Sequence, residues 1–252
     1  MEGRNVRSSF KQIVGAAIVV FTAALAVVSI PAKAGEADAF HAAQHEAYGH
    51  YREALFYARR GNPSAAFELE AAHDQWADLV TRFGAAPPAP YDTDPQWKST
   101  LETVGGHMEK ALVSAGDDDL KAAWAQLKPV RGLLRDLRRR SKVVLFADHV
   151  DTANLTFQAL FHFRRNPPDF NDAAQVKDLE TRLAATIAAY ERCRKMAPPD
   201  VAANDQFQRL LKDSLFYLDR MKIAIAEKNQ LSVVNILRRV ISSNNLLWLR
   251  FG

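Results

Sequence analysis

Histidine is the residue type in this sequence with the clearest capacity for chemistry. Five of the seven histidines lie in the first half of the 252-residue chain, at His41, His45, His50, His73 and His107. Neutral imidazole nitrogens are ligands for zinc, copper and iron. Imidazoles gathered inside a helical protein therefore indicate either a transition-metal site, such as a zinc or copper site, or a hydrogen-bonded network.

Three of these histidines are predicted to lie at one height along neighbouring helices. His50 lies 11 or 12 residues before the turn at Gly61-Asn62. His73 lies 11 or 12 residues after that turn, and His107 precedes the turn at Gly116 by nine residues. At a rise of about 1.5 Å per residue, the three levels agree within roughly 4 Å. This layer is the predicted metal site.

Two further features extend the metal hypothesis. His41 and His45 are spaced i and i+4 on the first predicted helix, so their side chains share one face. Glu70 and His73 form one Glu-x-x-His step, as in di-iron carboxylate bundles, but the second such step is missing, which argues against a di-iron centre. The competing interpretation is that the histidines are isolated, hydrogen-bonded core or boundary residues.

The densest run of positive charge is a second candidate for function. It comprises Arg131, Arg135, Arg138, Arg139, Arg140 and Lys142. Basic residues at the end of a helix complement the helix dipole, so one interpretation is a solvated helix face. The other is a contact surface for an acidic protein partner or for anionic lipid headgroups.

The remaining reactive and aromatic side chains indicate packing before they indicate chemistry. Cys193, the single cysteine, is predicted to be a buried, inert thiol. Six aromatic residues are interpreted as core or boundary residues first and as a ligand-binding wall second: Tyr48, Tyr51, Tyr57, Trp76, Trp97 and Trp124. The sequence contains no catalytic triad order, paired-carboxylate spacing, phosphate loop or nucleotide fingerprint, so a non-enzymatic protein is predicted.

A repeated stretch shows which elements must position these residues. The sequence ALFYARR at residues 54–60 returns as ALFHFRR at residues 159–165, and each copy runs into a turn that contains proline. The register holds through both halves, which predicts a duplicated chain. At the places of the five histidines the second copy has bulky side chains, namely Phe146, Val150, Leu155, Leu183 and Tyr217. The histidines are therefore expected in or beside the core of the first copy.

Helical periodicity and turn signals predict an all-α fold of two tandem, internally duplicated, up-down four-helix bundles after an N-terminal signal peptide. The bundles span residues 36–140 and 141–252. The predicted seam of the second helix consists of Leu69, His73, Trp76, Val80 and Phe83. Pro129 is expected to kink the fourth helix. Only Ser141 interrupts the fourth and fifth helices, which are expected to run nearly continuously.

This helix order, together with an export signal, resembles that of exported four-helix-bundle cytochromes. The resemblance implies the fold of each half and nothing about a site. The sequence has no Cys-x-x-Cys-His motif, so no covalent haem is expected and no functional residue is carried over.

The N-terminus predicts export. Arg4, Arg7 and Lys11 precede an uncharged apolar run at residues 13–30, and Pro31-Ala32-Lys33-Ala34 has the form of a signal-peptidase site. A signal cleaved from residues 1–34 places the mature chain in the periplasm of a diderm bacterium. The alternative is an uncleaved inner-membrane anchor that faces the same compartment.

Charge narrows the range of partners. Removal of residues 1–34 lowers the Lys and Arg count from 33 to 29 and the Asp and Glu count from 29 to 28, so the net charge falls from +4 to +1. This balance argues against nucleic acid as a partner. The predicted partner is an envelope protein, and a membrane becomes a partner only if the signal stays uncleaved.

Overall fold

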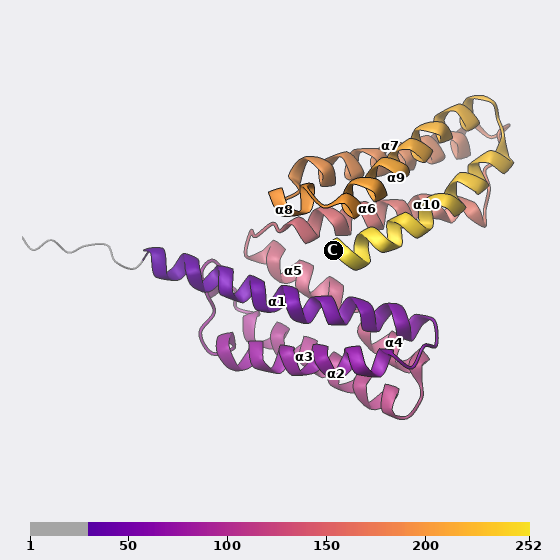
Figure 1. The fold of residues 1–252 in the computed structure, drawn as a ribbon. Coiled ribbons are helices and arrows are strands. Elements are labelled where there is room, and N and C mark those ends of the chain that lie inside the picture. The colour runs from indigo at the N-terminus through magenta and orange to yellow at the C-terminus, as the bar shows by residue number, and fades with distance from the viewer. Residues whose placement is uncertain (1–29) are drawn as a thin grey trace, which may run out of the picture.

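The computed structural model describes residues 30–252, and the regular elements in this range are all helices (Figure 1). The all-α prediction is thereby confirmed for this part of the chain. Most of the predicted signal lies outside the described residues, and its last five residues begin the first helix, α1 (Ile30–Arg59). Within residues 30–252 no helix has both the length and the apolar character needed to cross a membrane.

Five helices form the first helix group, which packs around its own hydrophobic core. They are α1, α2 (Ala65–Phe83), α3 (Trp97–Gly116), α4 (Leu120–Leu127) and α5 (Val130–Arg140). A short 3-10 helix, η1 (Tyr91–Thr93), precedes α3. The core of this group includes Phe40, Tyr51, Trp76, Leu101 and Leu127. The helices α4 and α5 are the two parts of the predicted fourth helix, which divides at Pro129 because proline has no N–H for the helical hydrogen bond.

The turn after α1 is built by its own sequence. Gly61 has φ of 65°, a left-handed conformation that glycine adopts without a steric penalty. The Gly61 N–H donates to the carbonyl of Ala58 at 3.1 Å, and the Asn62 N–H donates to the carbonyl of Tyr57 at 3.0 Å. These two bonds form a Schellman motif, so the chain reverses directly after the repeated stretch at residues 54–60.

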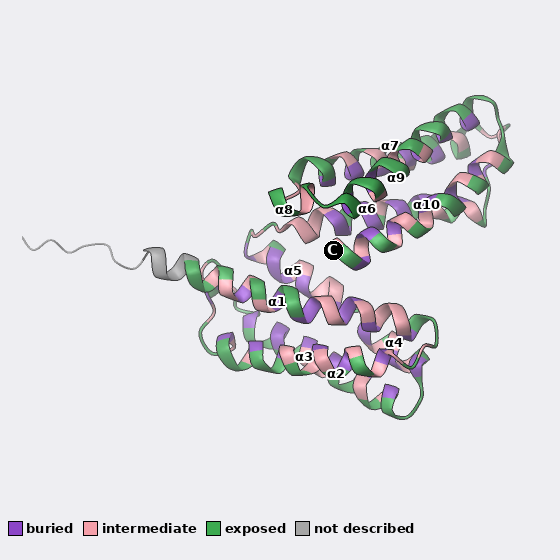
Figure 2. Cartoon of the chain, viewed as in Figure 1, coloured by how far each residue is buried: buried purple, intermediate pink, exposed green. Residues whose placement is uncertain are grey.

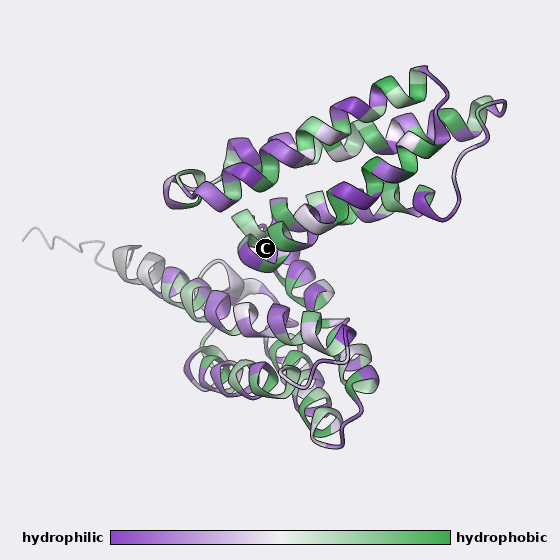
Figure 3. Cartoon of the chain, turned by 45° about the vertical axis from the view of Figure 1, so that its right-hand side comes forward, coloured by the Kyte–Doolittle hydropathy of each residue, from purple (hydrophilic) through white to green (hydrophobic). Residues whose placement is uncertain are grey.

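The second helix group has a separate core. It contains α6 (Phe146–Phe161), its continuation η2 (His162–Arg164), α7 (Ala173–Met196), α8 (Pro199–Ala202), α9 (Asp205–Ala226) and α10 (Gln230–Phe251). The side chains of Asp172, Asn204 and Asn229 cap α7, α9 and α10 by accepting backbone N–H bonds. Cys193 lies in this core, and burial raises the pKa of its thiol to about 12. Figure 2 shows the buried residues turned inward in each group, and Figure 3 shows polar and apolar stretches alternating along the helices.

The two helix groups meet where α1 contacts α10 and where α5 is joined to α6 by ion pairs (Figure 1). The predicted near-continuous helix across Ser141 is wrong, because α5 ends at Arg140 and α6 begins at Phe146. Lys142 has φ of 56° in the intervening turn, so the chain changes direction there. Trp248 in α10 packs against both hydrophobic cores and ties the two groups together.

Candidate functional site

The structure does not gather the predicted metal ligands. Within residues 30–252 no group of three or more His, Cys, Asp or Glu side chains is placed to hold a metal ion. The predicted layer rests on height along the helices, but successive residues also rotate by about 100° around a helix axis. Equal heights therefore do not bring His50, His73 and His107 together.

Each of the first three histidines has its own surroundings. His41 Nε2 lies 2.9 Å from the Tyr91 hydroxyl, and His50 Nδ1 lies 2.7 Å from the Glu68 carboxylate. His45 is exposed, so it does not lie in the core as expected. Burial lowers the pKa of both His41 and His45, so these two imidazoles favour the neutral form.

The helix α2 places His73 differently from the predicted seam. Its buried face consists of Ala65, Leu69, Ala72, Trp76, Leu79 and Phe83. Alanines complete this apolar stripe, so His73 lies at the boundary, with Nδ1 3.3 Å from the Asp74 carboxylate, and Glu70 is exposed. His107 Nδ1 is buried and has no hydrogen-bond partner among the described residues. This geometry matches the interpretation in which the histidines are isolated.

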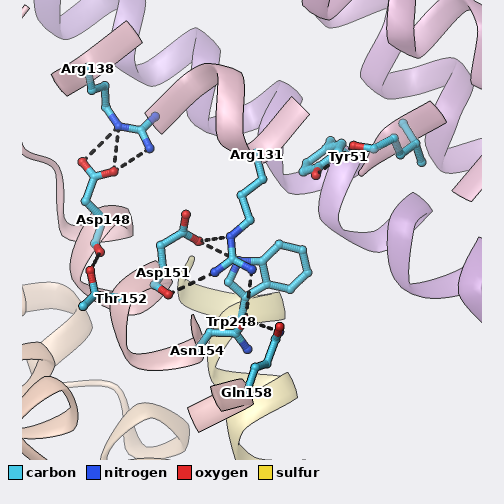
Figure 4. Close-up of polar contacts among 10 residues, drawn as sticks. Tyr51, Arg131, Arg138, Asp148, Asp151, Thr152, Asn154, Gln158 and Trp248 are labelled. Atoms are coloured by element: carbon cyan, nitrogen blue, oxygen red, sulfur yellow. Dashed lines mark hydrogen bonds and ion pairs between the residues drawn. The ribbon is translucent and has the colours of Figure 1, made fainter. Parts of the chain in front are cut away.

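The basic run is not a single exposed face. Arg138 is only 5% exposed, and its Nη2 donates to Asp148 Oδ1 on α6 at 2.7 Å. Arg131 forms an ion pair with Asp151, also on α6, with 2.7 Å between Nε and Oδ1 (Figure 4). Asn154 accepts a further hydrogen bond from Arg131 at 2.9 Å. We call these two arginine-aspartate contacts the junction pairs, because they join α5 of the first helix group to α6 of the second.

The other members of the basic run divide into bound and exposed residues. Arg140 lies 2.9 Å from the Asp94 carboxylate in an ion pair within the first helix group. Arg139 and Lys142 are exposed, and Arg135 is half-buried. Three of the six predicted contact residues therefore have internal carboxylate partners, which corrects the prediction of one solvated or partner-binding face.

A groove of about 620 Å³ lies beside the junction pairs, between the two helix groups. It is lined by side chains from α1, from the segment spanning α4 and α5, and from α6 and α10. The lining contains no described carboxylate but five cations, namely Arg59, Arg60, Lys128, Arg131 and Arg135. Arg131 pairs with Asp151. The other four cations form no ion pair with any carboxylate that the structure describes.

Aromatic rings lie beneath three of the groove cations. The pairs are Arg60 over Phe56 at 3.9 Å, Lys128 over Trp124 at 4.7 Å and Arg131 over Trp248 at 4.9 Å, measured to the ring centroid. The negative face of an aromatic ring attracts a cation but uses none of its N–H donors for a conventional hydrogen bond. These contacts restrain the cations, and for Arg60 and Lys128 they leave the N–H donors available to an anion, whereas the Arg131 nitrogens already contact Asp151 and Asn154.

The sequence interpretation included Arg131 and Arg135 but missed Arg59, Arg60 and Lys128 as members of one site. A signal for Lys128 exists, because it precedes Arg131 by three residues and Arg135 by seven, and this spacing places all three on one helix face. Arg59 and Arg60 end the first repeated stretch. Their approach to α5 depends on how α1 packs, which the spacing does not reveal.

The chemistry of the groove suits binding. Guanidinium and ammonium groups, aromatic faces and side-chain amides line it, and the described lining contains no carboxylate or histidine to act as a general base. No family model, curated protein or solved structure matches this chain. The function is therefore inferred from the site itself.

Proposed function

We propose that this chain is a non-enzymatic binding protein that accepts an anionic ligand in the groove between its two helix groups. The observation that carries this proposal is the set of four unpaired cations in a groove that no described carboxylate lines. Gathered like charges repel one another and destabilise the compact state. An anion that enters the groove relieves this repulsion and gains charge-assisted hydrogen bonds without first breaking an ion pair.

An acidic segment of an envelope protein and a small anion would both satisfy this charge pattern. The alternative prediction, a ligand-free envelope protein that binds another protein through the basic run, therefore remains open, but its contact surface becomes the five groove cations in place of the whole basic run. Arg131 and Arg135 remain in that set. A metal-binding role has less support, because the described histidines form no cluster.

The proposed setting is the periplasm, reached through the signal at residues 1–34, and the proposed origin of the fold is a duplicated four-helix bundle. Helix contacts support the duplication, because α1, α2, α3 and α4 contact one another in the same cyclic order as α6, α7, α9 and α10. The repeated stretches also lie at equivalent places, at the end of α1 and at the end of α6 with η2. Each copy then contributes one wall of the groove.

Anion binding is tested by titrating the purified chain with sodium tripolyphosphate while tryptophan fluorescence is recorded. Trp124 and Trp248 line the groove, so occupancy should change their emission. The wild-type response should saturate and should weaken as salt rises. The double variant Arg59→Gln, Arg135→Gln should bind about a hundredfold more weakly or worse, because it loses two charge-assisted hydrogen bonds, each worth about 1.5 kcal/mol or more.

The matched control is the double variant Arg209→Gln, Lys212→Gln. It removes two exposed charges from α9, which contributes nothing to the groove lining. Its affinity for tripolyphosphate should stay within about twofold of wild type, because neither residue lines the groove and exposed charges are screened by salt. Equal losses in the two double variants would indicate a diffuse charge effect and would contradict the proposed site.

A further inference from the structure

The two walls of the groove differ in chemistry. All five cations come from the first helix group. The second helix group contributes only uncharged side chains, which are Asn154, Leu155, Gln158, Asn245 and Trp248. A ligand that fills the groove therefore meets positive charge on one side and amide and apolar groups on the other. It is expected to carry its negative charge on one edge and an uncharged body opposite.

The size of the groove favours a small ligand over a protein segment. Its volume of about 620 Å³ lies within the range of about 300–1,000 Å³ that is typical of small-molecule sites. One turn of an α-helix with its side chains, about 11 Å across and 5.4 Å long, occupies about 500 Å³. The groove can thus hold little more than one helical turn of a partner protein, whereas it can enclose most of a small molecule.

Apolar surface in the groove indicates what the ligand body is made of. The lining includes six aromatic or leucine residues, which are Tyr51, Leu55, Phe56, Trp124, Leu155 and Trp248. Half-buried indole rings offer flat faces on which another ring can stack. Gly132 in α5 also lines the groove, and a Cβ built there would meet no atom within 4 Å. This leaves open space next to the helix backbone that a ring can occupy.

From these observations we infer that the ligand is a small organic anion with an aromatic body. Its charged group lies against the cations of α1 and α5, and its body lies between α5 and the second helix group. This inference rests on the proposed function, because it names the chemical class of the anion that the groove accepts.

Two dyes separate the contribution of the body from that of the charge. The first, 8-anilinonaphthalene-1-sulfonate, carries an aromatic body and one sulfonate. The second, N-phenyl-1-naphthylamine, has the same body without the sulfonate. The purified chain should bind one molecule of the sulfonated dye, about tenfold more tightly than the uncharged dye or better, because charge-assisted hydrogen bonds form only with the first.

A glycine variant tests whether the body lies in the groove. Gly132→Leu fills the open space beside α5 and leaves every charge in place. It should weaken binding of the sulfonated dye about tenfold or more, through steric exclusion, and change tripolyphosphate affinity by no more than about twofold. Gly106→Leu is the matched control, because Gly106 lies in α3, outside the groove lining, and a Cβ there also meets no atom within 4 Å.

Folding is not expected to limit this test, because leucine favours helix over glycine by roughly 0.8 kcal/mol in both variants. Circular dichroism melts check this. Lys128→Gln provides a second measurement, because it removes one groove charge at similar side-chain volume and should weaken both the sulfonated dye and tripolyphosphate.

Three results would overturn the inference. The first is that the sulfonated dye binds wild type and Gly132→Leu with equal affinity, and the second is that wild type binds the two dyes with equal affinity. Either result would reject an aromatic anion but would not affect the tripolyphosphate result or the proposed function. The third is that polyglutamate binds more tightly than the dye and that Gly132→Leu does not weaken this binding. This result would indicate that the ligand is an acidic protein segment and not a small anion. Tripolyphosphate binding that ignores the groove cations would instead contradict the proposed function.

Discussion

Three arginines on α5 lie within eight residues of one another and have different surroundings. Arg131 and Arg138 are paired with Asp151 and Asp148 across the junction, whereas Arg135 lies between them in the sequence and forms no ion pair with a described carboxylate. A buried charge needs a partner, because desolvation costs several kcal/mol per ion. A charge in the groove keeps part of its hydration and therefore does not need a charged partner. Pairing therefore separates the charges that hold the fold together from those available to a ligand.

Breaking a junction pair should give the largest effect. Asp148→Ala removes the carboxylate from Arg138, whose side chain is only 6% exposed, and also removes the acceptor of the Leu145 N–H at the start of α6. We expect a loss of about 3–5 kcal/mol in the free energy of unfolding, measured with urea. Asp136→Ala, which frees only the exposed Arg139, should change it by less than about 1 kcal/mol. Similar losses in the two variants would remove the distinction between junction and surface charges.

The second junction pair should give a smaller loss of stability and a gain in binding. Asp151 is buried, forms the ion pair with Arg131 and accepts the Trp248 indole N–H at 2.9 Å. Asp151→Asn should cost about 2–3 kcal/mol, because Arg131 loses its charged partner while the shape of the side chain is kept. The freed guanidinium adds a fifth unpaired cation to the groove. Tripolyphosphate affinity should therefore rise about threefold, and a fall in affinity would contradict this account.

The two copies of the repeat also differ at two titratable positions. Burial lowers the pKa of His41 and His45 below the ordinary value of 6.5, whereas the second copy has Phe146 and Val150 at these places. The unfolded chain then binds protons more readily than the folded one. The stability that the neutral forms of His41 and His45 contribute is therefore complete above pH 6.5 and is lost as the pH falls through the lowered pKa. The double variant His41→Phe, His45→Val should show a smaller drop in melting temperature between about pH 8 and about pH 5. An unchanged drop would assign the pH dependence to other groups.

The smallest effect on stability should come from the groove cations. Lys128→Gln and Arg135→Gln each remove a cation that pairs with no described carboxylate. The free energy of unfolding should change by no more than about 0.5 kcal/mol, because the relief of like-charge repulsion is offset in Lys128→Gln by the lost contact with the Trp124 ring. Urea unfolding of both variants checks this. A loss of more than about 1 kcal/mol would reveal an internal structural role and weaken the contrast with the junction pairs.

Much of the fold follows from local signals in the sequence. Gly61 ends α1, and Pro129 divides α4 from α5, because each imposes its effect on its own stretch of backbone. The errors arise where a choice depends on distant contacts. In α2, a stripe through Ala72 and a stripe through His73 fit nearly the same spacing, and only the packing of neighbouring helices selects the first. The left-handed conformation of Lys142, which breaks the predicted continuous helix, is not signalled by its residue type.

The candidate site was less predictable than the fold. The spacing of Lys128, Arg131 and Arg135 predicts a shared helix face but not what that face contacts. The carboxylates that bind two of the arginines lie on α6, and no local pattern states which arginine each carboxylate pairs with. The groove itself forms only where two helix groups meet, so its walls come from segments that are distant in the sequence.

The four tryptophans of the chain provide the most direct test of the central claim that an anion binds between the two helix groups. Trp124 and Trp248 line the groove, whereas Trp76 and Trp97 are buried in the first core with their indole N–H groups bonded to backbone carbonyls at 3.0 and 3.1 Å. The measurement is a ¹H–¹⁵N spectrum of the four indole N–H signals during titration with tripolyphosphate. The account predicts that the signals of Trp124 and Trp248 shift and saturate together while those of Trp76 and Trp97 stay in place. Saturable shifts confined to Trp76 and Trp97, or no saturable shift of the two groove signals, would contradict it.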